Sequence, residues 1–445
     1  MTCGITGLQE DDEGKFGGNN MILIKNGRVI DPKSGLDQVQ DVVIDGGKIV
    51  AIGCMEPTGE YEQVIDAEGL VVAPGLIDVH VHFRDPGLTY KEDIQTGAAA
   101  AKKGGFTTVV TMANTKPPVD NVETVKYVLE EGKKTGINVL PAACITVGMK
   151  GQELVDMDAL KAAGAAGFTD DGIPIMDQNL VKTAMLKAKE LDVPLSFHEE
   201  DPAFISENGI NAGPSAKALG INGSPALAED SLVARDCMLA LHTGASVNIQ
   251  HISSKNAVKM VKLAKELGAD VWAEVTPHHI ALDESAVLEK GAMAKMNPPL
   301  RTAKDREDII EGIKNGSIDM IATDHAPHSA EEKAVQPVWK APSGIIGLET
   351  ALAIAVTELV RKGHLTMVQL MEKMSLNPAK LYRFDKGYLA EGADADLVIF
   401  NENECWTVTE NDIASKSCNT PFIGTELYGR VKYTICGGQV VYEDK

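Results

Sequence analysis

The chain has 445 residues, of which 44% are hydrophobic and 24% charged, and its formal net charge at pH 7 is −22. This length and composition predict a globular protein with one large domain and a smaller one. The acidic charge argues against nucleic acid or an anionic membrane as partner, so an anionic small-molecule substrate would have to be bound by local cationic side chains.

Cysteine usage and hydropathy indicate a cytoplasmic protein. The seven cysteines are scattered without a Cys-x-x-Cys pair, which favours a reducing compartment over a disulfide framework. Glu349 and Glu358 interrupt the longest apolar segment before it reaches membrane-spanning length. The acidic run at 10–13 stands where a signal peptide would need basic and then apolar residues.

The two ends of the chain have the pattern of short β-strands. Residues 1–20 are polar and rich in glycine, and we expect a disordered extension there. Over 21–74, β-branched runs alternate with turn signals such as Asn26-Gly27, and a similar pattern returns over 386–445. Because chain termini often lie together, we expect these segments to form one small β-sandwich domain, with a separate C-terminal β domain as the alternative.

The central part of the chain, 75–385, alternates apolar β-branched runs with helical stretches, several of which end at a glycine. Strands are predicted at 76–82, 106–112, 138–144, 165–169, 193–198, 246–251, 270–275 and 318–323. Eight strands over about 250 residues are typical of a (β/α)₈ TIM-type barrel. The predicted fold class is therefore α/β.

His80 and His82 end the first predicted barrel strand. Alternate side chains of a strand point to the same face, so both imidazoles could bind one metal ion, whose charge can acidify a bound water. Taken alone, such a pair is more often two ordinary strand histidines beside a polar cleft.

Further potential metal ligands follow other barrel strands, at the end where active sites of such barrels form. They are Asp170, Asp171, His198, His251 and Asp324. Each of these residues, taken alone, would be interpreted as structural, since a strand-end aspartate commonly caps the next turn or helix. Together, four imidazoles and two carboxylates suit two ions about 3.5–4 Å apart that share a ligand. Spacing leaves Asp170 and Asp171 both open as the shared ligand.

The sequence resembles the amidohydrolase superfamily and, within it, the bacterial class of dihydroorotases that has a metal-bridging aspartate. The resemblance covers nearly the whole chain from Met21, in family order. It is carried by PGLIDVHVHFRDPG at 74–87, TMANT at 111–115, FTDDG at 168–172, EVTPHH at 274–279, KMNPPLR at 295–301 and IATDHAPH at 321–328.

The resemblance implies a cofactor of two Zn²⁺ ions per chain. His80, His82 and Asp324 would bind one ion, and His198 and His251 the other, with Asp171 between them as the favoured bridge.

The resemblance also implies a substrate site. Arg84, Asn114 and His328 match positions that bind the substrate's α-carboxylate, Asn297 matches a contact to the pyrimidine ring, and the loop 342–347 matches a stretch that supplies backbone hydrogen bonds. One departure concerns Asn114: relatives usually have Met-Pro-Asn where this chain has Met-Ala-Asn.

The implied reaction is the reversible cyclisation of N-carbamoyl-L-aspartate to L-dihydroorotate in de novo pyrimidine biosynthesis, with a metal-bound hydroxide as nucleophile and Asp324 as general acid and base. An allantoinase or a hydantoinase is the nearest alternative, but those relatives usually bridge their metals with a carboxylated lysine. A non-catalytic scaffold for aspartate transcarbamoylase is a second alternative, although such chains lack several ligands that this one has. We expect a homodimer, and association with aspartate transcarbamoylase stays open.

The remaining candidates are expected to support the structure. His278 and His279 follow the seventh predicted strand, and we favour supporting roles for them and for His325. Cys144, without a nominated base, is expected to be a small buried hydrophobe.

Overall fold

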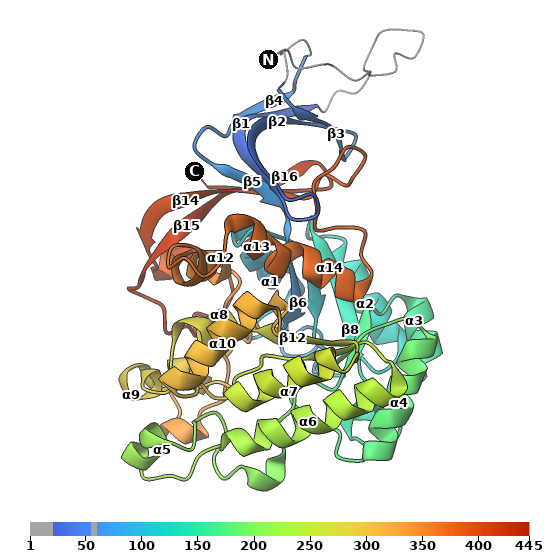
Figure 1. The fold of residues 1–445 in the computed structure, drawn as a ribbon, viewed down its shortest axis with the longest axis vertical. Helices are drawn as coiled ribbons and strands as arrows, with labels where there is room; N and C mark the ends of the chain where they lie inside the picture. The colour runs from blue at the N-terminus through green and yellow to red at the C-terminus, as the bar shows by residue number, and fades with distance from the viewer. Residues whose placement is uncertain (1–20, 55–59, 445) are drawn as a thin grey trace.

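The computed structural model describes residues 21–54 and 60–444, so the expected extension at 1–20 lies outside the described residues. Figure 1 shows a barrel surrounded by helices, with a sheet packed against one end. Among the described residues, the search for a helix with the length and hydropathy of a membrane span found none.

The barrel consists of parallel strands in sequential order, as the sequence predicts. They are β6 (Leu76–Val81), β7 (Phe106–Thr111), β8 (Asn138–Ala143), β9 (Gly167–Thr169), β10 (Leu195–Phe197), β11 (Val247–Ile249), β12 (Val271–Val275) and β13 (Met320–Ile321). The first and last strands meet through a parallel bridge between Val81 and His325, where the His82 amide donates to the His325 carbonyl at 2.8 Å. This bridge nearly closes the barrel.

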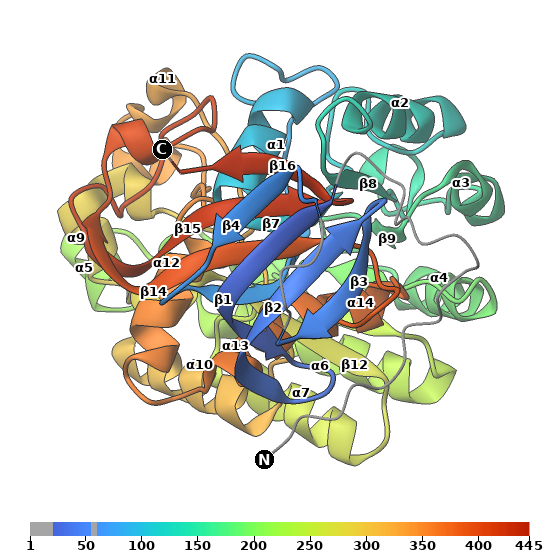
Figure 2. The same cartoon turned by 90° about the horizontal axis from the view of Figure 1, so that it is seen from above.

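Helices cover the outside of the barrel (Figures 1 and 2). They include α1 (Ile94–Lys103), α2 (Val122–Gly132), α3 (Met157–Ala163), α4 (Gln178–Glu190), α6 (Ala226–Thr243), α7 (Lys255–Glu266), α10 (Ala303–Asn315) and α12 (Ala351–Ala355). Polar residues begin most of them: Asp93 and Thr302, for example, form capping boxes at α1 and α10. Apolar helix faces bury against the strands in one large core.

The end of the barrel at which α14 (Asn377–Tyr382) lies is filled by apolar side chains. Ile77 and Val79 of β6 pack there with Met320 of β13 and with Leu381 and Tyr382 of α14. The opposite end, where the strands finish, carries buried polar residues instead. Among the described residues, the polar groups that could form a site thus lie at the carboxyl ends of the strands.

Both ends of the chain contribute to one further sheet, as expected. Its strands are β1 (Ile22–Asp31), β2 (Leu36–Asp45), β3 (Lys48–Gly53), β4 (Gln63–Asp66), β5 (Val71–Pro74), β14 (Leu397–Thr407), β15 (Glu426–Cys436) and β16 (Gln439–Glu443). A register shift between Ile24 and Gly27 bends β1, so its first half pairs with β4 and its second half with β5. β5 pairs antiparallel with β14, which joins the two chain ends. Figure 2 shows this sheet lying across the barrel.

Candidate active site

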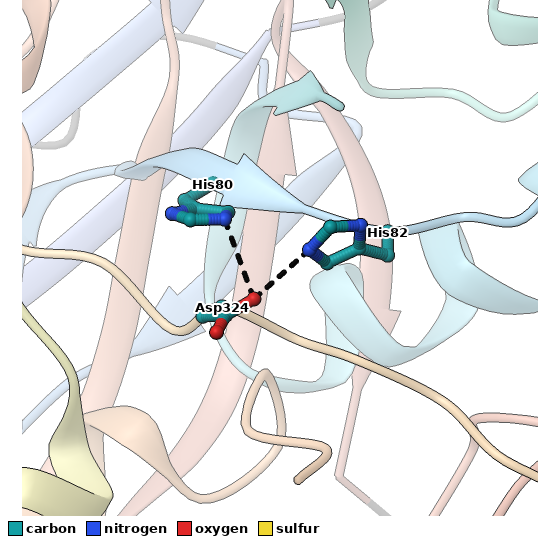
Figure 3. A group of neighbouring side chains, drawn as sticks. All are labelled: His80, His82 and Asp324. Carbon is teal, nitrogen blue, oxygen red and sulfur yellow. Dashed lines mark hydrogen bonds and ion pairs between the residues drawn. The ribbon is translucent and has the colours of Figure 1, made fainter. Parts of the chain in front are cut away.

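His80, His82 and Asp324 meet at the carboxyl end of the barrel (Figure 3). Asp324 Oδ1 lies 3.3 Å from His80 Nε2 and 2.9 Å from His82 Nε2. All three side chains are buried, with at most 5% of each residue exposed. Two imidazoles and a carboxylate thus point at one small volume, as the spacing His-x-His predicts.

A second group adjoins the first and shares His80 with it. The ligand atoms of His80, Asp171 and His251 lie within 4.8 Å of one another. His198 Nδ1 is 2.8 Å from His251 Nε2 and 3.8 Å from Asp171 Oδ1. All six predicted metal ligands therefore gather in one place, although they come from five different strand ends.

The two neighbouring aspartates differ in what they contact. Asp170 accepts hydrogen bonds from the Ile145 and Thr146 amides at 2.8 and 3.1 Å, and from the Thr146 hydroxyl, so its carboxylate is occupied by the next loop. Asp171 lies 3.4 Å from His80 Nε2 and 3.3 Å from His82 Nε2. The geometry favours Asp171 as the shared carboxylate.

Three residues at the site have backbone torsions unusual for side chains other than glycine. Arg84 has a φ of 59°, His251 of 30° and Asp324 of 47°. Such conformations cost free energy and persist where the surrounding structure enforces them, commonly at functional sites.

Two buried glutamates orient the histidines. Glu274 Oε1 bonds to His80 Nδ1, which places the proton on that nitrogen and directs the free Nε2 at the cluster. Glu200 Oε2 lies 3.1 Å from His198 Nε2 and does the same for the other histidine, with Nδ1 facing the cluster. The sequence reasoning gave neither glutamate a role. For Glu274 the sequence did offer a signal, because it is the charged residue in the otherwise apolar strand β12.

The electrostatics of the cluster favour bound positive charge. Burial lowers the pKa of His80, but Asp324, Glu274 and Asp171 outweigh burial and raise it well above the usual value. Burial raises the pKa of Asp171, but the histidines, His80 foremost, bring it well below its usual range. A cation, whether a proton or a metal ion, is therefore stabilised between these side chains.

The donor set fits divalent metal ions. Within the described chain, His80 Nε2 and Asp171 Oδ1 are buried without a hydrogen-bond partner, and both point into the cluster. Such orphaned groups are costly unless a ligand satisfies them. Imidazole nitrogens and carboxylate oxygens are the ligands that zinc and similar ions prefer.

The predicted substrate residues surround the cluster. Arg84 is buried, and its Nε donates to the Pro327 carbonyl at 3.3 Å. His328 Nδ1 lies 3.3 Å from Lys91 Nζ and 3.2 Å from Glu332 Oε2. Burial, together with Arg84 and Lys91, lowers the pKa of His328 to about 3, so its imidazole is neutral near pH 7.

Asn114 and Asn297 take different positions. Asn114 Oδ1 is 2.9 Å from His82 Nδ1, so in this structure its amide holds a potential metal ligand. Asn297 lines a cleft of about 490 Å³ together with His198, Gly172 and Trp339. Its buried Oδ1 has no hydrogen-bond partner in the described chain, which leaves it free for a ligand.

The contacts and burial of His278, His279, His325 and Cys144 are those of residues that support the structure. His279 Nε2 lies 3.0 Å from the Pro298 carbonyl, and His325 Nε2 lies 3.3 Å from Glu92 Oε2. His278 is buried, which lowers its pKa well below the usual value. Burial raises the pKa of the Cys144 thiol, so this cysteine stays protonated.

Comparison with known proteins places this site in a family. A family model described as "Dihydro-orotase-like" matches residues 69–257, and one described as "Amidohydrolase family" matches 345–442. Dihydroorotase from Clostridioides difficile (strain 630) is 62% identical over 95% of this chain and 100% of its own length. Dihydroorotase from Clostridium acetobutylicum is 54% identical over 96% of this chain and 100% of its own length.

Solved structures show the same architecture. L-hydantoinase (dihydropyrimidinase) from Arthrobacter aurescens superposes with a TM-score of 0.86 and 25% identity, covering 95% of this chain and 96% of its own. Dihydropyrimidinase from Brevibacillus agri has a TM-score of 0.83 and 26% identity, covering 96% of this chain and 95% of its own. With relatives that are 54–62% identical over 95–96% of its length, the chain belongs to the dihydroorotase family of the amidohydrolases.

Proposed function

We propose that this protein is a dihydroorotase, which interconverts N-carbamoyl-L-aspartate and L-dihydroorotate in de novo pyrimidine biosynthesis. The observation that carries the proposal is the convergence of six buried potential metal ligands beside a buried arginine, in a chain 62% identical to a dihydroorotase. The histidine and carboxylate cluster suits hydrolysis of an amide, and the arginine suits the substrate's carboxylate.

The proposed ligands are those expected from the sequence. His80, His82 and Asp324 would hold one Zn²⁺ ion, His198 and His251 a second, and Asp171 would lie between the two. When bound, such ions polarise an amide carbonyl and lower the pKa of water, which makes a nucleophile available near neutral pH.

Asp324 is proposed as the general acid and base. Its carboxylate is buried and lies within 3.3 Å of both His80 and His82, at the centre of the cluster. In ring opening it would accept the proton of the attacking water and deliver that proton to the departing ring nitrogen. In ring closure the same carboxylate would run the two transfers in reverse.

The substrate's carboxylate is proposed to bind between Arg84 and His328. The planar guanidinium of arginine can donate two parallel hydrogen bonds to a carboxylate, which lysine cannot reproduce. The low pKa of His328 leaves a neutral imidazole, whose Nδ1 lies beside both the Lys91 ammonium and the Glu332 carboxylate. Asn297, whose amide oxygen is unpaired, would contact the pyrimidine ring.

A hydantoinase or allantoinase activity is the second candidate, favoured by the similarity to solved hydantoinase structures. Those relatives are 24–27% identical to this chain, whereas the dihydroorotases reach 62%. Here the position between the histidine groups is held by the Asp171 carboxylate. We also propose a cytoplasmic homodimer, and association with aspartate transcarbamoylase remains a possibility to test by co-purification.

The decisive experiment offers the purified, metal-analysed protein three cyclic substrates: L-dihydroorotate, allantoin and hydantoin. Ring opening is followed by loss of ultraviolet absorbance or by chromatography. We expect rapid opening of dihydroorotate and little of the other two. Preferential opening of hydantoin or allantoin would replace the proposal with the second candidate, and inactivity of the zinc-loaded protein toward all three would support the scaffold alternative.

A further inference from the structure

Asn419 lies in the long connection between β14 and β15, far in sequence from the barrel strands, yet it contacts the candidate substrate site. Its side chain is buried, with 2% of the residue exposed. Its Oδ1 accepts a hydrogen bond from the His328 amide at 3.0 Å. Its Nδ2 donates to the Ala326 carbonyl at 2.9 Å and to the Gly344 carbonyl at 3.0 Å.

These bonds use both amide hydrogens of Asn419 and one lone pair of its oxygen, and they join two separate segments. One is 326–328, which carries His328 and the Pro327 carbonyl that Arg84 contacts. The other is 343–347, which belongs to the loop 342–347 that matches a supplier of backbone hydrogen bonds to substrate. The backbone carbonyl of Asn419 adds a fourth bond, because it accepts from the Ile346 amide at 3.1 Å.

The two segments are in close contact where Asn419 holds them. A Cβ atom at Gly344 would lie 2.8 Å from His328 Cδ2 and 2.7 Å from the Ala326 carbonyl, so only glycine allows this approach. Neither segment belongs to a regular strand; they meet at an isolated bridge between His325 and Ile345, where the Ala326 amide donates to the Ile345 carbonyl at 3.0 Å. That single main-chain bond is supplemented by the three side-chain bonds of Asn419, which hold the segments on either side of it.

We propose that Asn419 is a positioning residue for substrate recognition, which fixes His328 and the 343–347 loop at the distance needed to hold the substrate's carboxylate. The proposal deepens the proposed function and rests on it. Without the Asn419 amide, one backbone N–H and two carbonyls would be buried without partners, and the segments would separate to reach water. A misplaced His328 would weaken substrate binding while leaving the metal cluster intact.

The test compares Asn419→Ala and Asn419→Asp with the wild type. The aspartate variant keeps an acceptor for the His328 amide but places an oxygen against two carbonyls. Asn377→Ala is the matched control, because Asn377 is also buried and donates to a single carbonyl, that of Asp319, at the entry to β13 and remote from the site. Asn419→Ser serves if the alanine variant does not fold.

Five quantities are measured: zinc content, thermal unfolding, kcat for dihydroorotate, KM for dihydroorotate, and hydrogen exchange of peptides that cover 324–328 and 343–347. We expect Asn419→Ala to raise KM about tenfold or more, with kcat within about threefold of wild type and unchanged zinc content. Asn419→Asp should raise KM at least as much. Hydrogen exchange should become faster in both segments, whereas Asn377→Ala should lower only thermal stability.

The proposal is overturned if a folded Asn419→Ala protein keeps the wild-type KM and exchange, or if the control raises KM equally. A wild type that does not open dihydroorotate would refute the proposed function instead. In that case the exchange rates alone decide whether Asn419 holds the two segments together.

Discussion

Replacing Glu274 by glutamine tests whether a buried carboxylate prepares His80 to bind metal. Glu274 is fully buried, and its Oε1 contacts both the His80 imidazole and, at 3.3 Å, the His251 amide. Its Oε2 accepts from Asn248 Nδ2 at 2.9 Å. Glutamine keeps the shape and one acceptor for His80 but removes the negative charge.

The expected loss can be worked from these contacts. Removing the carboxylate behind a metal-binding histidine typically lowers metal affinity about 10- to 100-fold, which corresponds to about 1.4–2.7 kcal/mol. Glu274 is shielded from solvent and supports two of the proposed ligands, so we expect the upper part of this range. Asn248 can rotate its amide to accept from the new glutamine, because its Oδ1 has no partner within the described chain.

Zinc affinity is measured on metal-free protein by competition with a chromophoric chelator near neutral pH. Glu92→Gln is the matched control: Glu92 is equally buried and lies 3.3 Å from His325, which is not among the proposed ligands. Wild-type zinc affinity in a folded Glu274→Gln protein would refute the reasoning. A loss of affinity as large in Glu92→Gln would show that any buried charge change disturbs the site.

Three further predictions address catalysis, binding and stability. Asp324→Asn should abolish turnover yet leave the fold intact, measured by ring opening and circular dichroism, and a variant that keeps turnover would remove the acid–base role. Arg84→Lys should raise KM about tenfold or more with a smaller change in kcat, because lysine loses the paired hydrogen bonds; an unchanged KM would show that the carboxylate binds elsewhere. Burial and neighbouring Lys295 lower the pKa of Lys333 from 10.5 to about 7. At pH values between these two pKa values, Lys333 is mostly protonated in the unfolded state and mostly neutral in the folded state. The free energy of unfolding of the wild type should therefore rise with pH relative to that of Lys333→Met. Urea unfolding from pH 7 to 10 measures this difference. If the free energies of unfolding of the two proteins changed with pH in parallel, the result would contradict the prediction.

The position of the site was predictable because each proposed ligand lies at the end of a barrel strand or within three residues beyond it. In a parallel barrel all strands end at one rim, so residues far apart in sequence, such as His80 and Asp324, meet there. Strand ends were less predictable. The eighth strand, expected over 318–323, spans only Met320–Ile321, because the Thr323 amide bonds to the Asp78 carboxylate instead of continuing the ladder.

The residues that support the site were not predictable in the same way. Glu274 acts through His80, which lies 194 residues away in the chain, and no spacing rule connects the two. Glu200 lies only two residues after His198, but neither side chain carries a pattern that indicates the contact. Asn419 lies outside the barrel segment, in a connection whose path depends on how the terminal sheet packs. Local sequence patterns report periodicity and strand ends, whereas such contacts depend on tertiary packing over hundreds of residues.

The acidic net charge of −22 and an anionic substrate are compatible because of where the cations lie. At physiological ionic strength, charges farther apart than about 8 Å are largely screened in solvent, so most surface carboxylates act weakly on a bound ligand. Arg84 and Lys91 are 9% and 6% exposed and flank His328, where low dielectric strengthens each charge. The Glu332 carboxylate beside Lys91 is shared between Lys91, His328 and the Tyr90 hydroxyl. The charge that a bound substrate meets is therefore set by these few buried groups and not by the sum over the chain.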